Sequence, residues 1–463
     1  MRVRNYPSAI AVALAAALAL PVLTGATADE AARDIPRLII STDVATGLID
    51  THGGMSLTPV SFDADHAYST DSNVAPQDID DGLTLAMALN LDAAGLAEVL
   101  AVVPTYGNAT LPAEMLVARK IVRKLKGRKD IPVVPGAIGP AAHILNPTAT
   151  WFDGRTVPIT GASGSFAQAC DNSGVALMRR KLNQANGFGR SGKVTILAIG
   201  PLTDVACLLE TASKKTLKNI AEIVILASRV KGESLTVNGK VVNDFNFRMD
   251  PVAGTILLVS AGKNSVPVRL MSFSLSGVTS QKATLFGFDR ATYPGRRPAT
   301  RASRKSYRWL IKASKPRQDY WKGIFGTIEG PFDQYTLAAA LKPDLFDCAD
   351  GLAQVDMCPY PAWSPDYPTD SNGDPTEEPF NAPGNRCTDH GTANGASLSE
   401  VPAELVVTEG TGHAGALVRG TTGVDGNIPK FKGTAAQPVT VCTGFAGSKG
   451  RSGFESFLKT WTW

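Results

Sequence analysis

Three aspartates are the residues of this chain best suited to chemistry. Asp80 and Asp81 stand side by side in QDIDDGLTLAMAL, where an apolar helical run begins, and Asp43 ends an apolar strand-like run, RLIISTD. Strand ends and the starts of the following helices meet at one edge of an α/β sheet. Three carboxylates brought together there repel one another unless a cation holds them. The pattern therefore predicts a metal site.

A fourth aspartate, Asp333 in GPFDQYTLAAAL, also opens an apolar helix. All these donors are oxygen atoms, and none of the five histidines stands beside them in the sequence. Oxygen-only ligation favours Ca²⁺ or Mg²⁺ over zinc or copper. The competing interpretation is that aspartate simply caps helices, which would suffice for Asp81 or Asp333 taken alone.

The elements that must position these residues alternate between strand and helix over the first three hundred residues. Continuous apolar runs, typical of buried parallel strands, lie at 37–41, 98–103, 131–136, 193–200, 222–228 and 266–273. Helical patterns lie between them at 80–90, 112–126, 173–185, 202–214 and 251–261. Short strands at AELVVTE, GALVRGTT and QPVTVCTG and a helix at GFESFLKTWTW close the chain. The alternation predicts an open, doubly wound, mostly parallel α/β sheet.

Two irregular insertions interrupt this pattern, at about 44–79 and 359–397. The first is rich in Gly, Thr, Ser and Asp and falls between the first strand and its helix, so we expect it beside the metal site. A loop this long in a compact domain is usually functional or mobile. The second is rich in Pro, Asn, Gly and Asp. With these insertions, 29–463 is predicted to be a single domain.

Residues 1–28 have the pattern of a cleaved signal peptide. Arg2 and Arg4 are followed by an apolar run, 9–23, and a small-residue cleavage site, Ala26-Thr27-Ala28. No later segment is long and apolar enough to cross a membrane. We therefore expect a secreted protein with no membrane partner.

Six cysteines fit an oxidising compartment: Cys170, Cys207, Cys348, Cys358, Cys387 and Cys442. Six cysteines allow fifteen pairings, among which the sequence does not choose. Cys348 and Cys358 would close the shortest loop, and Cys207, in an apolar helical run, is a candidate for a buried free thiol. The absence of any CxxC motif argues against zinc and redox roles.

The composition excludes some partners. The chain has 463 residues, of which 44% are apolar and 19% charged, with a net charge of +4. The densest basic stretch, 301–315, is better explained as a solvated helix face than as a nucleic-acid groove. No nucleic-acid partner is expected.

The order of several motifs resembles the inosine-uridine-preferring nucleoside hydrolase family. That family opens with an Asp-x-Asp-x-x-x-Asp-Asp signature; here Ser41-Thr42-Asp43 ends the first strand, and IDDGLTLAMAL supplies the aspartate pair after the insertion. Further segments match in order: VVPTYGNA with Gly107-Asn108, KDIPVVPGA, LAIGPLTDVACLL, VNGKVVNDFNFRMDPVA with Asn238, Asp244-Phe245-Asn246 and Asp250-Pro251, and FDQYTLAAALKPDLF. The resemblance covers most of the mature chain outside the insertions.

The resemblance implies one Ca²⁺ at the bottom of a pocket. Its ligands would be the carboxylates of Asp43, Asp81 and Asp333, the backbone carbonyl of Ile199 and a water molecule. Asp43 would also be the general base that takes the proton of that water. The reaction would be hydrolysis of the N-glycosidic bond of a ribonucleoside, through an oxocarbenium-like transition state.

The resemblance also assigns residues to the sugar. Asp80, Asn108 and Asn246 would hydrogen-bond the ribose 2′- and 3′-hydroxyls, and Asn238 and Asp244 would reach the 5′-hydroxyl.

The chain departs from the family pattern at three positions. Phe332 replaces a histidine that helps to protonate the leaving base, Ser41 replaces the first signature aspartate, and Asp244 replaces a glutamate. Phe332 and Tyr335 instead suggest stacking on a base, with ordinary core packing as the alternative, which is the favoured interpretation for Tyr335. The first insertion brings His52, on a glycine-rich turn, near the site as a candidate ligand-binding residue; the simpler interpretation is that it satisfies only the backbone of its own loop.

Two competing functions follow from these departures. One is a secreted, metal-dependent binding or effector protein that keeps the fold without hydrolysis. The other is a hydrolase for a different ribosyl or glycosyl substrate. Homo-oligomers are common in the family, but the insertions leave the oligomeric state open.

Overall fold

A computed structural model shows how these elements are arranged. It describes residues 35–50, 75–139, 170–185, 192–227, 229–230, 236–237, 240–241, 246–247, 250–272, 275, 301–325, 329–357, 403–409 and 437–461. The chain divides into Met1–Asp34, outside these ranges, and one compact unit, Ile35–Trp463. The signal peptide therefore stays a prediction.

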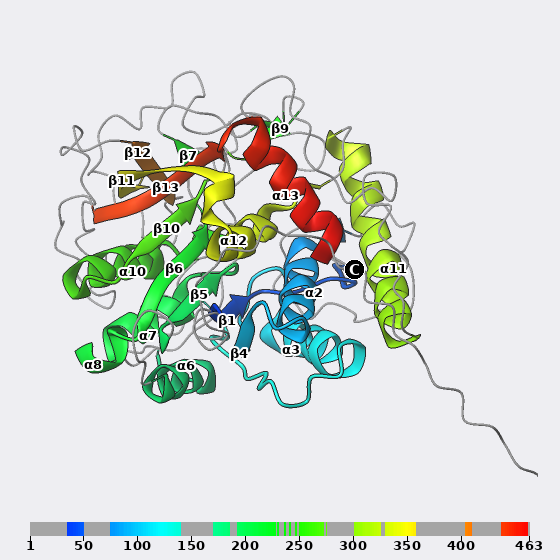
Figure 1. The fold of residues 1–463 in the computed structure, drawn as a ribbon, viewed down its shortest axis with the longest axis horizontal. Coiled ribbons are helices and arrows are strands. Elements are labelled where there is room, and N and C mark those ends of the chain that lie inside the picture. The colour runs from blue at the N-terminus through cyan, green and yellow to red at the C-terminus, as the bar shows by residue number, and fades with distance from the viewer. Residues whose placement is uncertain are drawn as a thin grey trace, which may run out of the picture. The chain divides into compact units, whose positions relative to one another are not determined.

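A nine-stranded sheet runs through the compact unit in the order β4-β1-β5-β6-β10-β13-β11-β12-β7 (Figure 1). Neighbours from β4 to β13 pair in parallel, whereas β11 is antiparallel to both of its neighbours. The predicted open, mostly parallel α/β sheet is thus confirmed. The strands are β1 (Arg37–Thr42), β4 (Glu98–Pro104), β5 (Val194–Ala198), β6 (Ile220–Leu226), β7 (Arg229–Val230), β10 (Val268–Met271), β11 (Phe346–Met357), β12 (Ala403–Glu409) and β13 (Gln437–Phe445).

Helices cover both faces of the sheet, which explains the continuous apolar runs. In β1, Leu38 and Ile40 join one apolar cluster and Ile39 the other, as the two-residue period of a strand requires. The first cluster includes side chains of α2 (Asp80–Ala93), α3 (Leu111–Arg119), α11 (Arg301–Phe325), α12 (Phe332–Leu341) and α13 (Gly447–Trp461). The second includes side chains of α6 (Ser173–Gln184), α7 (Thr203–Thr211), α8 (Lys214–Leu217) and α10 (Pro251–Asn264).

The direction of winding reverses at β1. The next long strand in the chain, β4, pairs with one side of β1, and β5 pairs with the other. Ligands of open α/β sheets bind outside the carboxyl ends of the strands at such a switch point. Asp43 is the first residue after β1, so the topology places it there.

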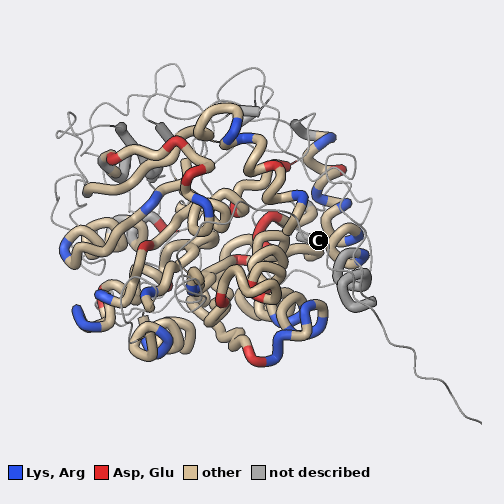
Figure 2. Tube along the Cα trace, in the orientation of Figure 1, with Lys and Arg blue, Asp and Glu red and all other residues tan. Residues whose placement is uncertain are grey.

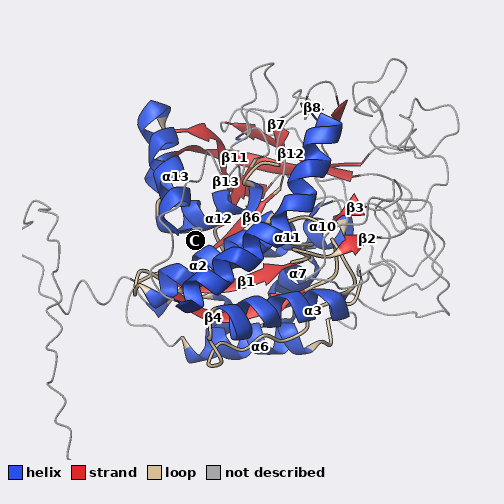
Figure 3. Ribbon diagram, turned by 90° about the vertical axis from the view of Figure 1, so that its right-hand side faces the viewer, coloured by secondary structure: helices blue, strands red, loops and turns tan. Residues whose placement is uncertain are grey.

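The first insertion has an ordered neck. β2 (Ile49–Asp50) pairs with β3 (Ala75–Pro76) in an antiparallel ribbon, on the side toward which β1 points (Figure 3). Residues 44–48 are largely buried, so the start of the predicted irregular segment belongs to the core. Residues 51–74, the second insertion and the predicted strand GALVRGTT lie outside the described residues.

The strand predicted at 131–136 is wrong. The structure has only an isolated bridge there, between Val133 and Val102. Pro132 and Pro135 have no backbone N–H to donate, so the apolar run IPVVPG cannot extend the ladder. The helix predicted at 112–126 is present as α3 followed by a π-helical turn, Lys120–Leu125.

Two disulfides lie in the described part of the chain. Cys170 pairs with Cys207, so the prediction of a free thiol at Cys207 is wrong. Cys348 pairs with Cys442 rather than with Cys358, because the antiparallel register of β11 and β13 places Cys348 and Cys442 directly opposite each other.

Charged residues are unevenly distributed in this unit. Lys and Arg are spread over several outer helices, while acidic residues also occur in the interior near the start of α2 (Figure 2). Within the described ranges, no helix combines the length and apolar composition needed to cross a membrane.

Candidate active site

The candidate site forms where β1 ends and α2 and α12 begin. Asp43, Asp80, Asp81 and Asp333 each have at most 3% of their surface exposed. Such burial is costly for carboxylates unless they are paired, protonated or bound to a cation. The structure therefore brings together the four aspartates that the sequence analysis singled out.

Asp81 is the centre of this group. Its carboxyl accepts a hydrogen bond from the Thr42 hydroxyl and lies within hydrogen-bonding reach of the carboxyls of Asp43 and Asp333. Burial is the main cause that raises the pKa of Asp81 to about 8, and the nearby carboxylate of Asp78 adds to it. The site thus concentrates negative charge in a dry environment, as a cation site requires.

Asp43 lies against the turn that follows β4. One carboxyl oxygen, Oδ2, accepts the Asn108 backbone N–H at 3.0 Å, whereas Oδ1 is buried without a hydrogen-bond partner. Burial first, then the charges of Asp81 and Asp78, raise the pKa of Asp43 well above its ordinary value. A buried, unsatisfied carboxylate oxygen is the group that a bound cation would satisfy.

A glycine allows this close approach. A Cβ on Gly107 would lie 2.1 Å from Asp43 Oδ2, and its φ of 154° is rare for other residues. Next along the turn, the Asn108 Nδ2 lies 3.4 Å from the Asp43 carbonyl oxygen and 3.3 Å from Asp81 Oδ2. The Gly107-Asn108 pair after β4 therefore contacts the carboxyl groups of both Asp43 and Asp81.

Asp80 fixes α12 against α2. Its Oδ2 accepts the backbone N–H of Asp333 at 3.1 Å, and its backbone carbonyl accepts the Gln334 Nε2 at 2.9 Å. These two bonds hold the starts of α2 and α12 together. They also bring the Asp333 carboxyl within reach of the Asp81 carboxyl. Burial raises the pKa of Asp333 well above its ordinary value, and the negative charges of Asp81 and Asp78 add to this effect.

The simple capping interpretation does not describe Asp81 or Asp333. The N-cap of α2 is Ile79 and that of α12 is Pro331, and neither cap residue makes a side-chain hydrogen bond. Asp81 and Asp333 lie inside the first turns, with their carboxyls directed to one another. Ordinary capping does occur elsewhere, since Asn172 caps α6 and Asp250 caps α10.

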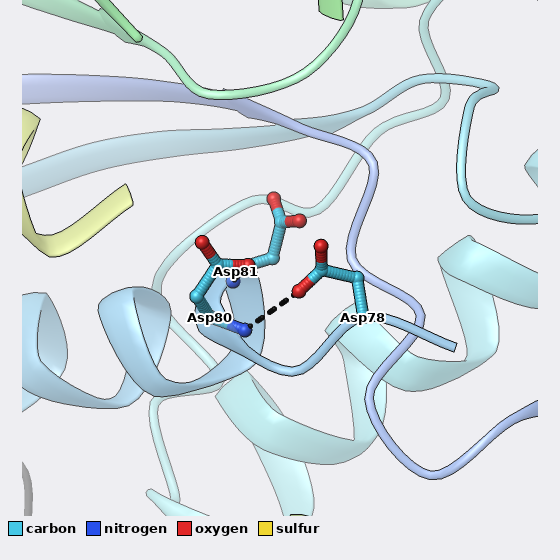
Figure 4. Close-up of side chains that lie close together, drawn as sticks. All are labelled: Asp78, Asp80 and Asp81. Carbon is cyan, nitrogen blue, oxygen red and sulfur yellow. Dashed lines mark hydrogen bonds between the residues drawn. The ribbon is translucent and has the colours of Figure 1, made fainter. Parts of the chain in front are cut away.

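Asp78 is a further member of the cluster that the sequence analysis missed. Asp78, Asp80 and Asp81 offer carboxylate oxygens within 4.8 Å of one another, a grouping able to hold a metal ion (Figure 4). The Asp80 backbone N–H donates to Asp78 Oδ1 at 3.0 Å. The signal was the acidic residue two positions before Asp80 in QDIDD.

The carbonyl of Ile199 follows β5 and accepts the Asn246 Nδ2 at 3.2 Å. A carbonyl oxygen has two lone pairs, so this bond leaves one for another partner. Asn246 is buried, and its contact places it beside the end of β5. Asn246 and Ile199 are therefore adjacent.

Phe332 is buried against α11. It is 5% exposed, and its ring lies 6.3 Å from that of Trp321 on α11. Tyr335 is fully buried among Phe346, Phe445 and Phe454, so it is a core residue. Three other predicted site residues lie outside the described residues: His52, Asn238 and Asp244.

Glu114 is a second residue that the sequence analysis missed. It is fully buried, and its Oε1 accepts the Ala109 backbone N–H at 2.9 Å, so it supports the turn that carries Gly107 and Asn108. Burial, then the charge of Asp43, raises the pKa of Glu114 well above its ordinary value. An acidic residue among the apolar positions of LPAEMLVAR was the available signal.

This arrangement agrees with comparisons to known proteins. A family model described as inosine-uridine preferring nucleoside hydrolase matches residues 70–445. The chain belongs to this family. The predicted enzyme class, an N-glycosyl hydrolase, is thereby confirmed.

The individual relatives have low sequence identity to this chain. The pyrimidine-specific ribonucleoside hydrolase RihA of Citrobacter koseri is 29% identical over 308 residues, which are 64% of this chain and 84% of that protein. RihA of Shewanella woodyi is 30% identical over 202 residues, 42% of this chain and 57% of that protein. The structure of a plant nucleoside hydrolase, the PpNRh1 enzyme, matches with a TM-score of 0.51 at 16% identity, over 92% of this chain and 99% of that one. At that identity, the likeness shows a shared fold.

Proposed function

We propose that this nucleoside hydrolase cleaves the N-glycosidic bond of ribonucleosides with the help of one Ca²⁺, outside the cytoplasm. The observation that carries the proposal is the contact of the buried Asp81 carboxyl with those of Asp43 and Asp333. Several buried carboxyls at a switch point favour a cation and stabilise the positive charge of an oxocarbenium-like transition state.

The donor set fits a hard cation. Asp43, Asp81 and Asp333 would hold it through carboxylates and Ile199 through its free carbonyl lone pair. When bound, Ca²⁺ would lower the pKa of a coordinated water and orient the sugar hydroxyls. The unsatisfied Oδ1 of Asp43 supports this fit.

The chain's own residues would perform the remaining steps. Asp43 would take the proton of the attacking water, since its carboxyl is held in place by the Asn108 N–H. Asn108, Asn246 and Asp80 would hold the ribose 2′- and 3′-hydroxyls. Asn238 and Asp244 would contact the ribose 5′-hydroxyl. His52 would also contact the ligand.

The proposal also includes export from the cytoplasm. It is supported by the signal-like pattern of residues 1–28 and by two disulfides, which persist in oxidising compartments. Detection of a mature chain beginning near Asp29 in the culture medium would test it.

A binding protein without hydrolysis is the second candidate. The observation that favours it is Phe332, which packs against Trp321 and carries no proton for a leaving base.

Pyrimidine nucleosides are the first substrates to test, because two relatives are named as pyrimidine-specific hydrolases.

Release of ribose by the purified mature chain tests both candidates. Uridine, cytidine, inosine and adenosine would each be supplied with Ca²⁺ and with EDTA. We expect Ca²⁺-dependent ribose from at least one of them, and loss of about 10³-fold or more in kcat for Asp43→Asn. Asp130→Asn, an exposed carboxylate paired with Arg128, is the control that should keep full activity. Calcium binding without any ribose release would favour the binding protein.

A further inference from the structure

One acidic side chain of the cluster has a basic partner. Asp78 precedes α2, and the Arg317 Nη2 lies 3.8 Å from its Oδ2. The side chain of Asp78 is 22% exposed, whereas Asp80 and Asp81 are nearly fully buried. Asp78 thus lies on the outer side of the cluster, immediately after the neck of the first insertion.

The guanidinium of Arg317 is held from three directions. Besides Asp78, its Nε lies 2.7 Å from Glu329 Oε1, and its Nη1 donates to the Pro76 carbonyl at 2.9 Å. A planar fork with three partners has little freedom to turn. Glu329 offsets the positive charge of Arg317, so the arginine can hold Asp78 without replacing a cation in the cluster.

We propose that Asp78 supplies a further oxygen to the cation of this site, and that Arg317 is the positioning residue that keeps it there. Two observations support this: the oxygens of Asp78, Asp80 and Asp81 lie within 4.8 Å of one another, and the buried Asp43 Oδ1 beside Asp81 has no hydrogen-bond partner. The inference rests on the proposed function only for the identity of the cation.

A purely structural salt bridge is the competing explanation. In that case, Asp78 would merely tie the end of the insertion to α11. Removing its charge would then lower stability with and without cation alike. In contrast, a carboxylate that faces other carboxylates repels them when no cation is bound. Asp78→Asn should therefore be at least as stable as the wild type in EDTA, but gain less from Ca²⁺.

The test measures cation binding by the full mature chain, using calcium titration calorimetry and terbium luminescence. We expect Asp78→Asn to weaken calcium binding by about tenfold or more, and Arg317→Lys, which loses the fork, by about three- to tenfold. Lys315→Met is the matched control on the same helix. Its side chain is 72% exposed and pairs with Asp319, so calcium affinity should stay within about twofold.

The outcomes separate this inference from the proposed function. Unchanged calcium affinity in Asp78→Asn, in a protein whose wild type hydrolyses nucleosides, would overturn the role of Asp78 and leave the function intact. Weakened affinity in a protein that releases no ribose would support Asp78 and overturn the function. Equal loss of melting temperature in EDTA and in calcium would show that the contact is only structural. Melting curves in EDTA also establish that each variant folds.

Discussion

At the scale of single residues, the site consists of four buried aspartates and of the residues that hold them in place, among them Arg317. Asp43, Asp80, Asp81 and Asp333 were identified because acidic residues at a strand end and at helix starts are informative without any structure. Arg317 was not, because nothing local in RQDYW indicates that its side chain reaches a carboxylate 239 positions earlier in the chain, at Asp78. Long-range pairing of charges depends on packing, which residue types alone do not reveal.

Gly107 gives a prediction at this scale. Gly107→Ala should displace the Asp43 carboxyl, because the new Cβ would lie 2.1 Å from its Oδ2. Calcium affinity should fall by about tenfold or more, equivalent to about 1.4 kcal/mol. Calorimetric titration measures this.

Gly95→Ala is the matched control. Gly95 also has a positive φ, 71°, but nothing lies within 4 Å of the added Cβ. It should lower stability by about 1–2 kcal/mol through backbone strain and leave calcium affinity unchanged. Equal affinities in the two variants would contradict the role of Gly107.

At the scale of elements, apolar periodicity predicted the main strands and helices but not how they meet. The contact between the starts of α2 and α12 joins residues 253 positions apart, Asp80 and Asp333. Likewise, the apolar run at 131–136 has the pattern of a buried strand, yet its prolines lack the backbone N–H groups that a ladder of hydrogen bonds needs. Periodicity reports burial; it does not report which backbone groups find partners.

The disulfide between β11 and β13 gives a prediction for these elements. Replacing both Cys348 and Cys442 by Ser should lower the free energy of unfolding by about 2–5 kcal/mol, because it removes a cross-link over 94 residues. Calcium affinity should not change, since no described site residue lies on either strand. Urea unfolding and calcium titration would be measured together. A loss of calcium affinity would mean that the strand pair supports the site.

At the scale of the whole molecule, the buried carboxyls link stability to pH and cation. The pKa of Asp81 is raised from 3.8 to about 8 by burial and by Asp78. Between these values, the folded state holds a proton that the unfolded state has released. Without cation, the free energy of unfolding should therefore fall as pH rises through this window.

Calcium should reverse part of this loss. Because a cation needs ionised ligands, its affinity should rise with pH, by up to about tenfold per pH unit for each proton displaced. Melting temperatures in EDTA and in saturating calcium, from pH 5 to 8, should therefore diverge as pH rises. Parallel curves would mean that the cluster does not bind calcium.

The narrow ribbon of β2 and β3 has a consequence for how this protein can change. Because Ile49 pairs with Pro76 and Asp50 with Ala75, the two ends of the segment between them lie side by side. The length of what lies between them has little effect on the closure entropy, which grows only with the logarithm of loop size. The ribbon is therefore a point at which segments of different length and sequence can be exchanged next to the buried aspartates, while the fold that aligns those aspartates stays the same.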